Sequence, residues 1–159
     1  MEVYKLKREF NATPDLVWTA WTDPKHVAHW YGPGVETVIH GFDLRVGGAW
    51  LTEMKMGPNS MYQRADFTAI EVGKRLTCIQ ANTDAEWNVV DNMMMPDMPR
   101  LLELDVEFSA KGAGTEMLLT WSPYNATDVE KAAFAGAMSK MGGGWSAGMD
   151  LLEELLSSL

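Results

Sequence analysis

The amino-acid sequence predicts an α+β domain in which an antiparallel sheet of about seven strands packs against one long C-terminal helix. Three observations predict this fold. Seven segments alternate polar and apolar residues with the period of two that half-buried strands show. Over residues 127–156 the apolar residues instead recur every three or four positions, as on one face of a helix of about 30 residues. After the first strand, Pro14 and Pro24 each follow a capping residue and mark the starts of two short helices.

The elements follow one another with short connections. The first strand is expected over residues 3–10, the first short helix after Thr13, and the second from Asp23 to about Trp30, before the glycines and proline of residues 32–34 break the helical pattern. The six remaining strands are expected at residues 35–42, 49–56, 61–72, 76–81, 101–109 and 115–121. Glycine-containing turns of hairpin length separate several of these segments, which indicates a largely antiparallel sheet.

The long helix is expected to begin with a capping box formed by Thr127 and Glu130. The residues of its apolar face are Phe134, Met138, Met141, Trp145, Met149, Leu152 and Leu156. Three consecutive glycines, residues 142–144, lie in its middle, and each costs about 1 kcal/mol relative to alanine in a helix interior. We therefore expect a kink or a short interruption there, followed by a leucine-rich half that fixes the helix to the sheet.

Composition and charge narrow the class of protein. The 159 residues fit one domain, residues 1–159, and 13 basic against 22 acidic residues give a formal charge of −9. This charge repels nucleic-acid phosphates and anionic lipids, so neither nucleic acid nor a membrane is an expected partner. Cys78 is the single cysteine, and the N-terminal residues lack the apolar core of a signal peptide. We expect a cytoplasmic protein; whether it is a monomer or a homodimer stays open.

Four motifs make the chain similar to a known family. They are VWTAWTDP at 17–24, WYGP at 30–33, DLRVGGAW at 43–50 and the Gly144-Trp145 pair in the long helix. The chain resembles the SRPBCC superfamily of START-like, helix-grip proteins, and within it the branch similar to the C-terminal domain of activators of the heat-shock protein 90 ATPase. The resemblance implies a curved sheet wrapped around the long helix, with a deep apolar cavity between them for a hydrophobic small molecule. Where the family usually has Gly-x-Tyr-x-Glu, this chain reads ADFTA at 65–69 and lacks the acidic residue often found there.

Strand alternation places large apolar side chains opposite the helix, and with the resemblance they predict the wall of a cavity for a lipid or an aromatic metabolite. The expected ligand-binding residues are Trp50, Met54, Phe67, Trp87, Met95, Trp121, Phe134, Met138, Met141 and Trp145. Methionine is unbranched and polarisable, which suits an irregular apolar guest. The same pattern also fits a solid core, because an apolar lining alone does not distinguish a pocket from a core.

Polar candidates for chemistry are few. The methionines of residues 93–98 could bind Cu(I) through their thioethers, but no histidine or cysteine accompanies them, and an apolar lid is the preferred interpretation. His26 and His29 share a helix face without a third ligand. His40, which could face inward, fits a structural histidine better than a catalytic base, and Arg45 fits an anchor of the turn at 45–48. The sequence predicts no catalytic residue, no metal site and no cofactor.

Three functions therefore stay open. The favoured one is a binding module for a hydrophobic small molecule, without a defined catalytic activity. The second is an enzyme of the cyclase or hydrolase type in which His40, Glu53 or Arg64 moves a proton, and it requires a buried polar group with a perturbed pKa in the cavity. The third is a co-chaperone-like regulator of a chaperone ATPase, which requires an exposed apolar patch.

Overall fold

The computed structural model of the protein describes residues 3–91 and 97–159, and the side chains of all of these except residues 139–144. The described residues form seven strands and three helices, in the order that the sequence predicts. The strands are β1 (Tyr4–Phe10), β2 (Glu36–Phe42), β3 (Ala49–Met56), β4 (Asn59–Glu71), β5 (Arg75–Thr83), β6 (Leu102–Lys111) and β7 (Gly114–Pro123). The helices are α1 (Pro14–Thr22), α2 (Pro24–Trp30) and α3 (Asp128–Ser157). Every predicted strand is confirmed, with ends within about two residues of those observed.

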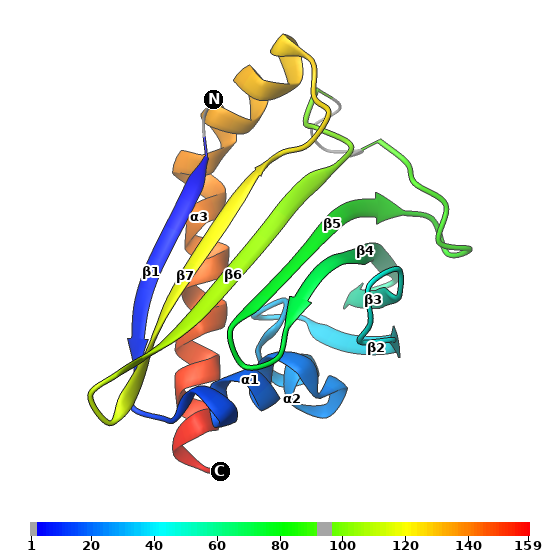
Figure 1. The fold of residues 1–159 in the computed structure, drawn as a ribbon. Coiled ribbons are helices and arrows are strands. Elements are labelled where there is room, and N and C mark those ends of the chain that lie inside the picture. Colours follow the sequence, from blue (N-terminus) through cyan, green and yellow to red (C-terminus); the bar gives the residue numbers. More distant parts are fainter. Residues whose placement is uncertain (1–2, 92–96) are drawn as a thin grey trace.

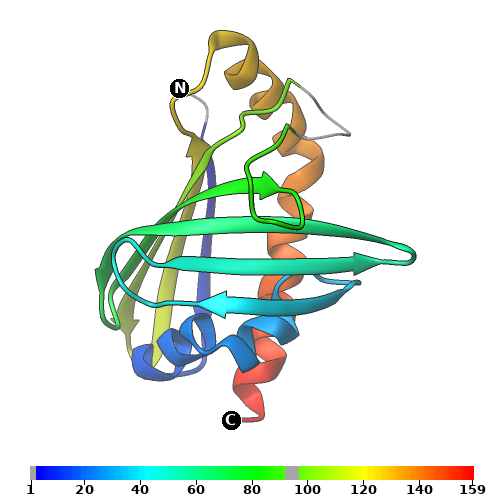
Figure 2. The ribbon, with the colours of Figure 1, turned by 90° about the vertical axis from the view of Figure 1, so that its right-hand side faces the viewer.

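All seven strands form one antiparallel sheet in the order β1-β7-β6-β5-β4-β3-β2. Strands β2 to β7 follow one another as a meander, and β1 joins it beside β7. The sheet curves strongly, so that β1, β7 and β6 run along one side of α3 while β2, β3 and β4 pass across another (Figures 1 and 2). The predicted α+β helix-grip fold is therefore confirmed.

The two short helices begin as their sequences predict. Thr13 Oγ1 accepts a hydrogen bond from the Leu16 amide at 3.4 Å, and Asp23 Oδ1 accepts one from the Lys25 amide at 3.0 Å. The rings of Trp21 and Trp30 are buried with their centroids 4.5 Å apart. This aromatic pair joins α1 to α2, the two short helices at the lower end of the sheet in Figure 1.

Helix α3 starts with the predicted capping box, in which the Thr127 amide donates to Glu130 Oε1 at 2.9 Å and the Glu130 amide donates to Thr127 Oγ1 at 3.2 Å. The helix then continues without a break to Ser157, so of the kink or interruption predicted at residues 142–144 the interruption is wrong. Its first turns, gold in Figures 1 and 2, tilt away from the axis of the rest. Packing of its apolar face against the sheet outweighs the helical cost of the glycines.

The C-terminal half of α3 is held to the rest of the protein by close contacts. A Cβ atom built on Gly148 would lie 3.2 Å from the Trp30 carbonyl oxygen, so α2 and α3 approach each other closely. Arg8 of β1 donates hydrogen bonds to the Ser146 carbonyl oxygen at 3.3 Å and to Asp150 Oδ1 at 2.5 Å. This half therefore clamps the helix to the sheet, as predicted. Among the described residues, no helix is both long enough and apolar enough to cross a membrane.

Candidate functional site

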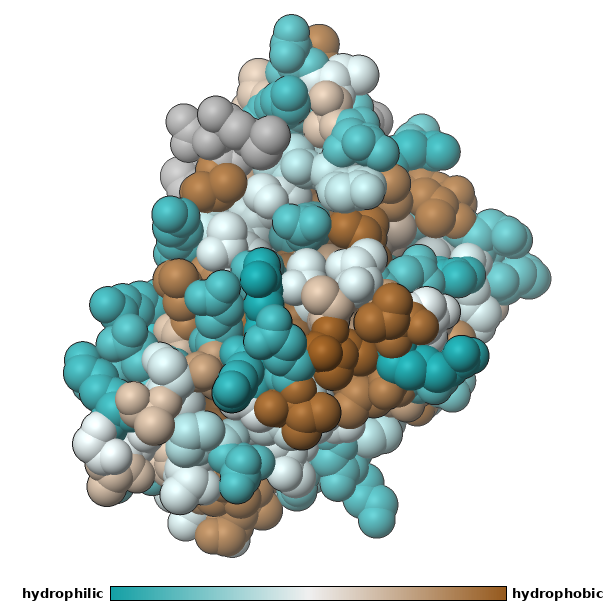
Figure 3. Space-filling view, viewed as in Figure 1, coloured by the Kyte–Doolittle hydropathy of each residue, from teal (hydrophilic) through white to brown (hydrophobic). Residues whose placement is uncertain are grey.

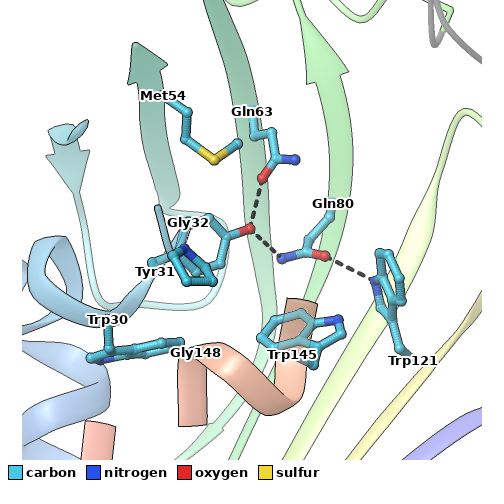
Figure 4. A pocket seen from close by; sticks show the side chains of 10 residues that line it. Trp30, Tyr31, Gly32, Met54, Gln63, Gln80, Trp121, Trp145 and Gly148 are labelled. Atoms are coloured by element: carbon cyan, nitrogen blue, oxygen red, sulfur yellow. Dashed lines mark hydrogen bonds between the residues drawn. The ribbon is translucent and has the colours of Figure 1, made fainter. Parts of the chain in front are cut away.

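A pocket of about 200 Å³ opens between α3, the loop after α2 and the inner face of the sheet. Aromatic side chains from α2, its C-cap, β7 and α3 form most of its wall: Trp30, Tyr31, Trp121 and Trp145. Met54 of β3, Gln63 of β4 and Gln80 of β5 line its sheet side (Figure 4), and the remaining lining residues are Gly32, Pro33 and Gly148. Two other hollows, of about 290 and 390 Å³, are lined largely by charged and polar side chains. The pocket beside α3 is the one with the apolar character that small-molecule sites show.

The end of α2 places Tyr31 at the pocket. Gly32 follows it with a φ of +69°, a left-handed conformation that glycine adopts without strain. A Cβ atom at Gly32 would lie 2.8 Å from Thr37 Oγ1 and 2.9 Å from Met54 Sδ. Thr37 Oγ1 also donates to the Tyr31 carbonyl oxygen at 2.7 Å, which ties the loop to β2. The WYGP motif is therefore the turn that presents Tyr31 to the sheet.

Trp145 brings α3 into the aromatic wall. Its ring centroid lies 6.1 Å from that of Tyr31 and 5.9 Å from that of Trp121, both with near-perpendicular planes. It also stacks over Trp21 at 6.4 Å. Edge-to-face and offset-stacked pairs are the favourable arrangements of aromatic rings, so these contacts fix the position of the Trp145 ring.

A chain of hydrogen bonds crosses the sheet side of the pocket (Figure 4). The Trp121 indole N–H donates to Gln80 Oε1 at 3.0 Å, and Gln80 Nε2 donates to the Tyr31 hydroxyl at 3.4 Å. The Tyr31 hydroxyl in turn donates to Gln63 Oε1 at 2.6 Å. Gln80 is only 8% exposed, so burying it would be costly without these two partners.

The electrostatics of the pocket are neutral. None of the described residues that line it is charged at neutral pH. Burial raises the pKa of the Tyr31 hydroxyl far above its usual value, and buried Cys78 adds to the shift. Tyr31 therefore stays protonated and acts as a hydrogen-bonding group.

Three of the ten expected ligand-binding residues line the pocket: Met54, Trp121 and Trp145. Three others, Trp50, Phe67 and Phe134, are at most 2% exposed and belong to the hydrophobic core. Trp50 borders only a neighbouring void that has no room for a water molecule. Solid packing thus fills much of the space that the resemblance assigns to a cavity.

Of the remaining four expected residues, Met138 and Trp87 do not line the pocket, and the other two cannot be placed. Met138 is half-buried and packs on the core. Met95 lies outside the described residues, and so does the side chain of Met141. Trp87 adopts a φ of +67° and packs with its ring centroid 5.5 Å from those of His40 and Tyr62.

Glu53 is the centre of a polar cluster on the opposite face of the sheet. It alternates with Met54 along β3 and therefore points away from the pocket. Its carboxylate accepts hydrogen bonds from Ser60 Oγ at 2.5 Å and contacts His40 Nε2 at 2.8 Å, and these bonds lower the pKa of Glu53. The expectation that His40 could face inward is wrong: its side chain is 43% exposed and contacts Glu53 on the outer face. A β-bulge between Ile39 and Gly41 separates His40 from Phe42, which pairs with Trp50 on the inner face.

Other polar candidates have structural contacts. Arg45 Nε donates to Asp43 Oδ2 at 2.7 Å, and the Gly47 amide donates to the Phe67 carbonyl oxygen at 2.9 Å. Arg45 therefore anchors its turn, as predicted. Arg64 pairs with Asp66 at 3.0 Å. Within residues 3–91 and 97–159, no group of three or more His, Cys, Asp or Glu side chains could hold a metal ion.

Sequence reasoning missed the polar part of the pocket. Tyr31 stands only within the WYGP motif, and neither Gln63 nor Gln80 is among the expected site residues. A signal was present for Gln63, which alternates with Ala65 and Phe67 on the inward face of β4. A polar side chain at an inward position of a strand is unusual enough to mark a site.

Comparisons with known proteins agree with this fold. The family model described as "Activator of Hsp90 ATPase homolog 1-like protein" matches residues 11–157. A search of curated proteins finds no match. Three similar solved structures are protein Ms6760 from Mycobacterium smegmatis, a protein from Arthrobacter aurescens and an AHSA1-like protein from Aeromonas hydrophila.

The similarity to these structures extends over nearly the whole chain. The M. smegmatis protein is 20% identical with a TM-score of 0.77, covering 98% of this chain and 91% of its own. The A. aurescens protein is 22% identical with a TM-score of 0.80, and the match covers 99% of this chain and 87% of the A. aurescens chain. The A. hydrophila protein is 19% identical with a TM-score of 0.69, and the match covers 99% of this chain and 93% of the A. hydrophila chain. At these identities the structures establish a shared fold, and the family model establishes membership. The chain belongs to the family of Activator of Hsp90 ATPase homolog 1-like proteins.

Proposed function

We propose that the protein binds a small, apolar, aromatic molecule in the pocket between the sheet and α3. The observation that carries this proposal is an uncharged space walled by four aromatic side chains, Trp30, Tyr31, Trp121 and Trp145. The fold of this family commonly holds hydrophobic ligands, which supports the same conclusion. Affinity would come from removing apolar ligand surface from water.

The size of the pocket favours an aromatic metabolite over a lipid. An apolar cavity of about 150 Å³ is enough to hold benzene. A pocket of about 200 Å³ therefore accommodates one aromatic ring with a small substituent. A long acyl chain would require the wall to move.

Binding is favoured over acid–base catalysis by the chemistry of the lining. His40, Glu53 and Arg64 do not line this pocket. Among the described lining residues Tyr31 is the titratable one, and its raised pKa moves it away from the neutral range where a proton-transfer group is effective. The pocket thus contains a group with a perturbed pKa, as an enzyme would require, but the shift is upward and keeps Tyr31 protonated. This direction favours a fixed hydrogen-bonding role for Tyr31.

A second candidate, docking to a chaperone ATPase, rests on the outer face of the sheet. Figure 3 shows strongly hydrophobic side chains gathered in one area of this face. Figure 1 has the same viewpoint and shows β2 to β4 in that area. An exposed apolar patch is typical of protein interaction sites. If this candidate holds, the purified protein changes the ATPase rate of an Hsp90-type chaperone; an unchanged rate at saturating protein excludes it.

The binding proposal is tested by filling the pocket. Fluorobenzene is titrated with the protein and followed by ¹⁹F NMR, for the wild type and for Met54→Trp. Because Met54 lines the pocket, the larger indole should occupy its volume and weaken binding by more than about tenfold. Met56→Trp is the matched control, since Met56 lies two residues away on β3, is 42% exposed and is not part of the lining. Equal affinities in the wild type and Met54→Trp would show that fluorobenzene does not occupy this pocket.

A further inference from the structure

The hydrogen-bond chain in the pocket has a fixed direction. An indole N–H can only donate, so the Gln80 side chain must turn its oxygen toward Trp121. The Gln80 nitrogen then faces the Tyr31 hydroxyl, which receives a donated proton on its oxygen. Tyr31 consequently directs its own proton to Gln63, which must present its oxygen. One donor-only side chain thereby sets the orientation of the three groups that follow it.

The chain ends on a donor without a partner among the residues that the structure describes. Because the Gln63 oxygen is taken by Tyr31, its amide nitrogen is the terminal group, and it makes no hydrogen bond with any described residue. Gln63 is half-buried and lines the pocket. An amide nitrogen carries two N–H donors, and the Gln63 nitrogen is not among the fully buried atoms without a partner, so water reaches it in the free protein. A ligand that displaces this water without supplying an acceptor leaves the donors unsatisfied, which costs free energy.

A second donor lies close to the same wall. The Trp50 indole nitrogen is buried and has no hydrogen-bond partner among the described residues. Trp50 borders the small void that shares Tyr31, Gln63 and Gln80 with the pocket. The Trp50 donor is enclosed beside the pocket, so Gln63 Nε2 is the donor that a ligand can reach, and none of the described lining residues is a cation that would neutralise an anion.

We propose that the pocket selects uncharged aromatic molecules that carry a hydrogen-bond acceptor such as a carbonyl group, and that Gln63 Nε2 is the donor that recognises it. This inference rests on the proposed binding function and adds the chemical class of the ligand. An anionic acceptor such as a carboxylate is disfavoured, because it would lose its hydration without gaining a positive partner and would meet a protein of formal charge −9.

The test compares ligands of one shape. Acetophenone, 2-phenylpropene and benzoate share a phenyl ring with a planar substituent, and they present a ketone oxygen, a CH₂ group and a carboxylate. Each competes with fluorobenzene, again followed by ¹⁹F NMR, and the affinity ratio of ketone to alkene is measured in the wild type and in Gln63 variants. The two ligands differ in their hydration in water, but this difference is the same for every protein variant. Comparing the affinity ratio between variants therefore removes it.

Two variants isolate the amide donor. Gln63→Glu keeps an oxygen for the Tyr31 hydroxyl and removes the N–H donors, whereas Gln63→Met removes both without adding charge. The ketone-to-alkene ratio is expected to fall about three- to tenfold in both, as the loss of one hydrogen bond predicts. Tyr62→Phe, which removes a hydroxyl from the outer face of the same strand, should leave the ratio unchanged.

The outcomes are distinguishable. A ratio that is the same in the wild type and both Gln63 variants overturns the assignment of the donor while leaving apolar binding intact. Benzoate binding more tightly than acetophenone to the wild type overturns the selection of uncharged ligands. If fluorobenzene itself fails to bind the wild type, the binding function is wrong and the inference falls with it. Fluorobenzene binding by each variant also verifies that its pocket is folded.

Discussion

At the scale of single residues, the pocket depends on polar side chains that are held inside an apolar wall. Gln80 has both ends of its amide satisfied, by Trp121 and by Tyr31, and Tyr31 has its hydroxyl bonded on both sides. Networks of this kind are stabilising when every member is paired, and removal of one member leaves another without a partner. Tyr31 connects the two glutamines and is the residue whose loss should be felt most widely.

The raised pKa of Tyr31 predicts how stability changes in alkali. An ordinary tyrosine loses its proton near pH 10, and burial raises the pKa of Tyr31 above this value. Above about pH 10 the folded state therefore holds a proton that the unfolded state releases, and the free energy of unfolding falls by at most about 1.4 kcal/mol per pH unit from this group. Below pH 10 the contribution of Tyr31 is fully present and constant.

Urea unfolding of the wild type and Tyr31→Phe between pH 8 and pH 11 measures this effect. The variant should lose stability less steeply above pH 10, although part of the slope remains because burial also raises the pKa of Cys78. Parallel slopes for the two proteins would mean that the Tyr31 hydroxyl ionises in the folded state as easily as in the unfolded chain.

At the scale of elements, α3 is a helix that is rich in glycine and that packs tightly against α2. The glycines do not all have the same role. At Gly148 an added Cβ would lie 3.2 Å from the Trp30 carbonyl oxygen, whereas at Gly136 nothing stands within 4 Å of it. Glycine at residue 148 therefore allows the two helices to approach, while at residue 136 it only lowers helix propensity.

Paired substitutions in α3 distinguish these roles. Gly136→Ala should raise the free energy of unfolding by up to about 1 kcal/mol, through the better helix propensity of alanine. Gly148→Ala should lower it by about 1 kcal/mol, because strain at the α2–α3 contact exceeds the same gain in propensity. Urea unfolding of both variants provides the measurement. A stabilised Gly148→Ala would show that α2 can move away from α3 at little cost.

At the scale of the whole molecule, the order of the elements could be predicted from the sequence because alternation, caps and glycine turns are local signals. β3 was predicted residue for residue, and the capping box of α3 was identified from Thr127 and Glu130. The continuity of α3 could not be predicted, because it depends on packing against a sheet made of distant segments. Tertiary contacts routinely override local propensity in this way.

The pocket was harder to predict than the fold for a related reason. Large apolar residues such as Trp50 and Phe134 are equally suited to a core and to a pocket wall, and in the structure they fill the core. Unbroken alternation places His40 and Phe42 on one face, but a bulge between Ile39 and Gly41 places them on opposite faces. Gly41 within the strand is a signal for such a bulge, although it does not say which residues change face. The facing of Gln80 likewise follows from the register of β5 with its neighbours.

The most direct test of the binding account is to locate a bound ligand by NMR. Intermolecular nuclear Overhauser effects between acetophenone and isotopically labelled protein report which side chains lie within about 5 Å of the ligand. We expect contacts with the rings of Tyr31 and Trp145 and with the Met54 methyl group, all of which line the pocket. Contacts confined to Trp87 and its neighbours on the opposite face of the sheet, with none to Trp145, would contradict it.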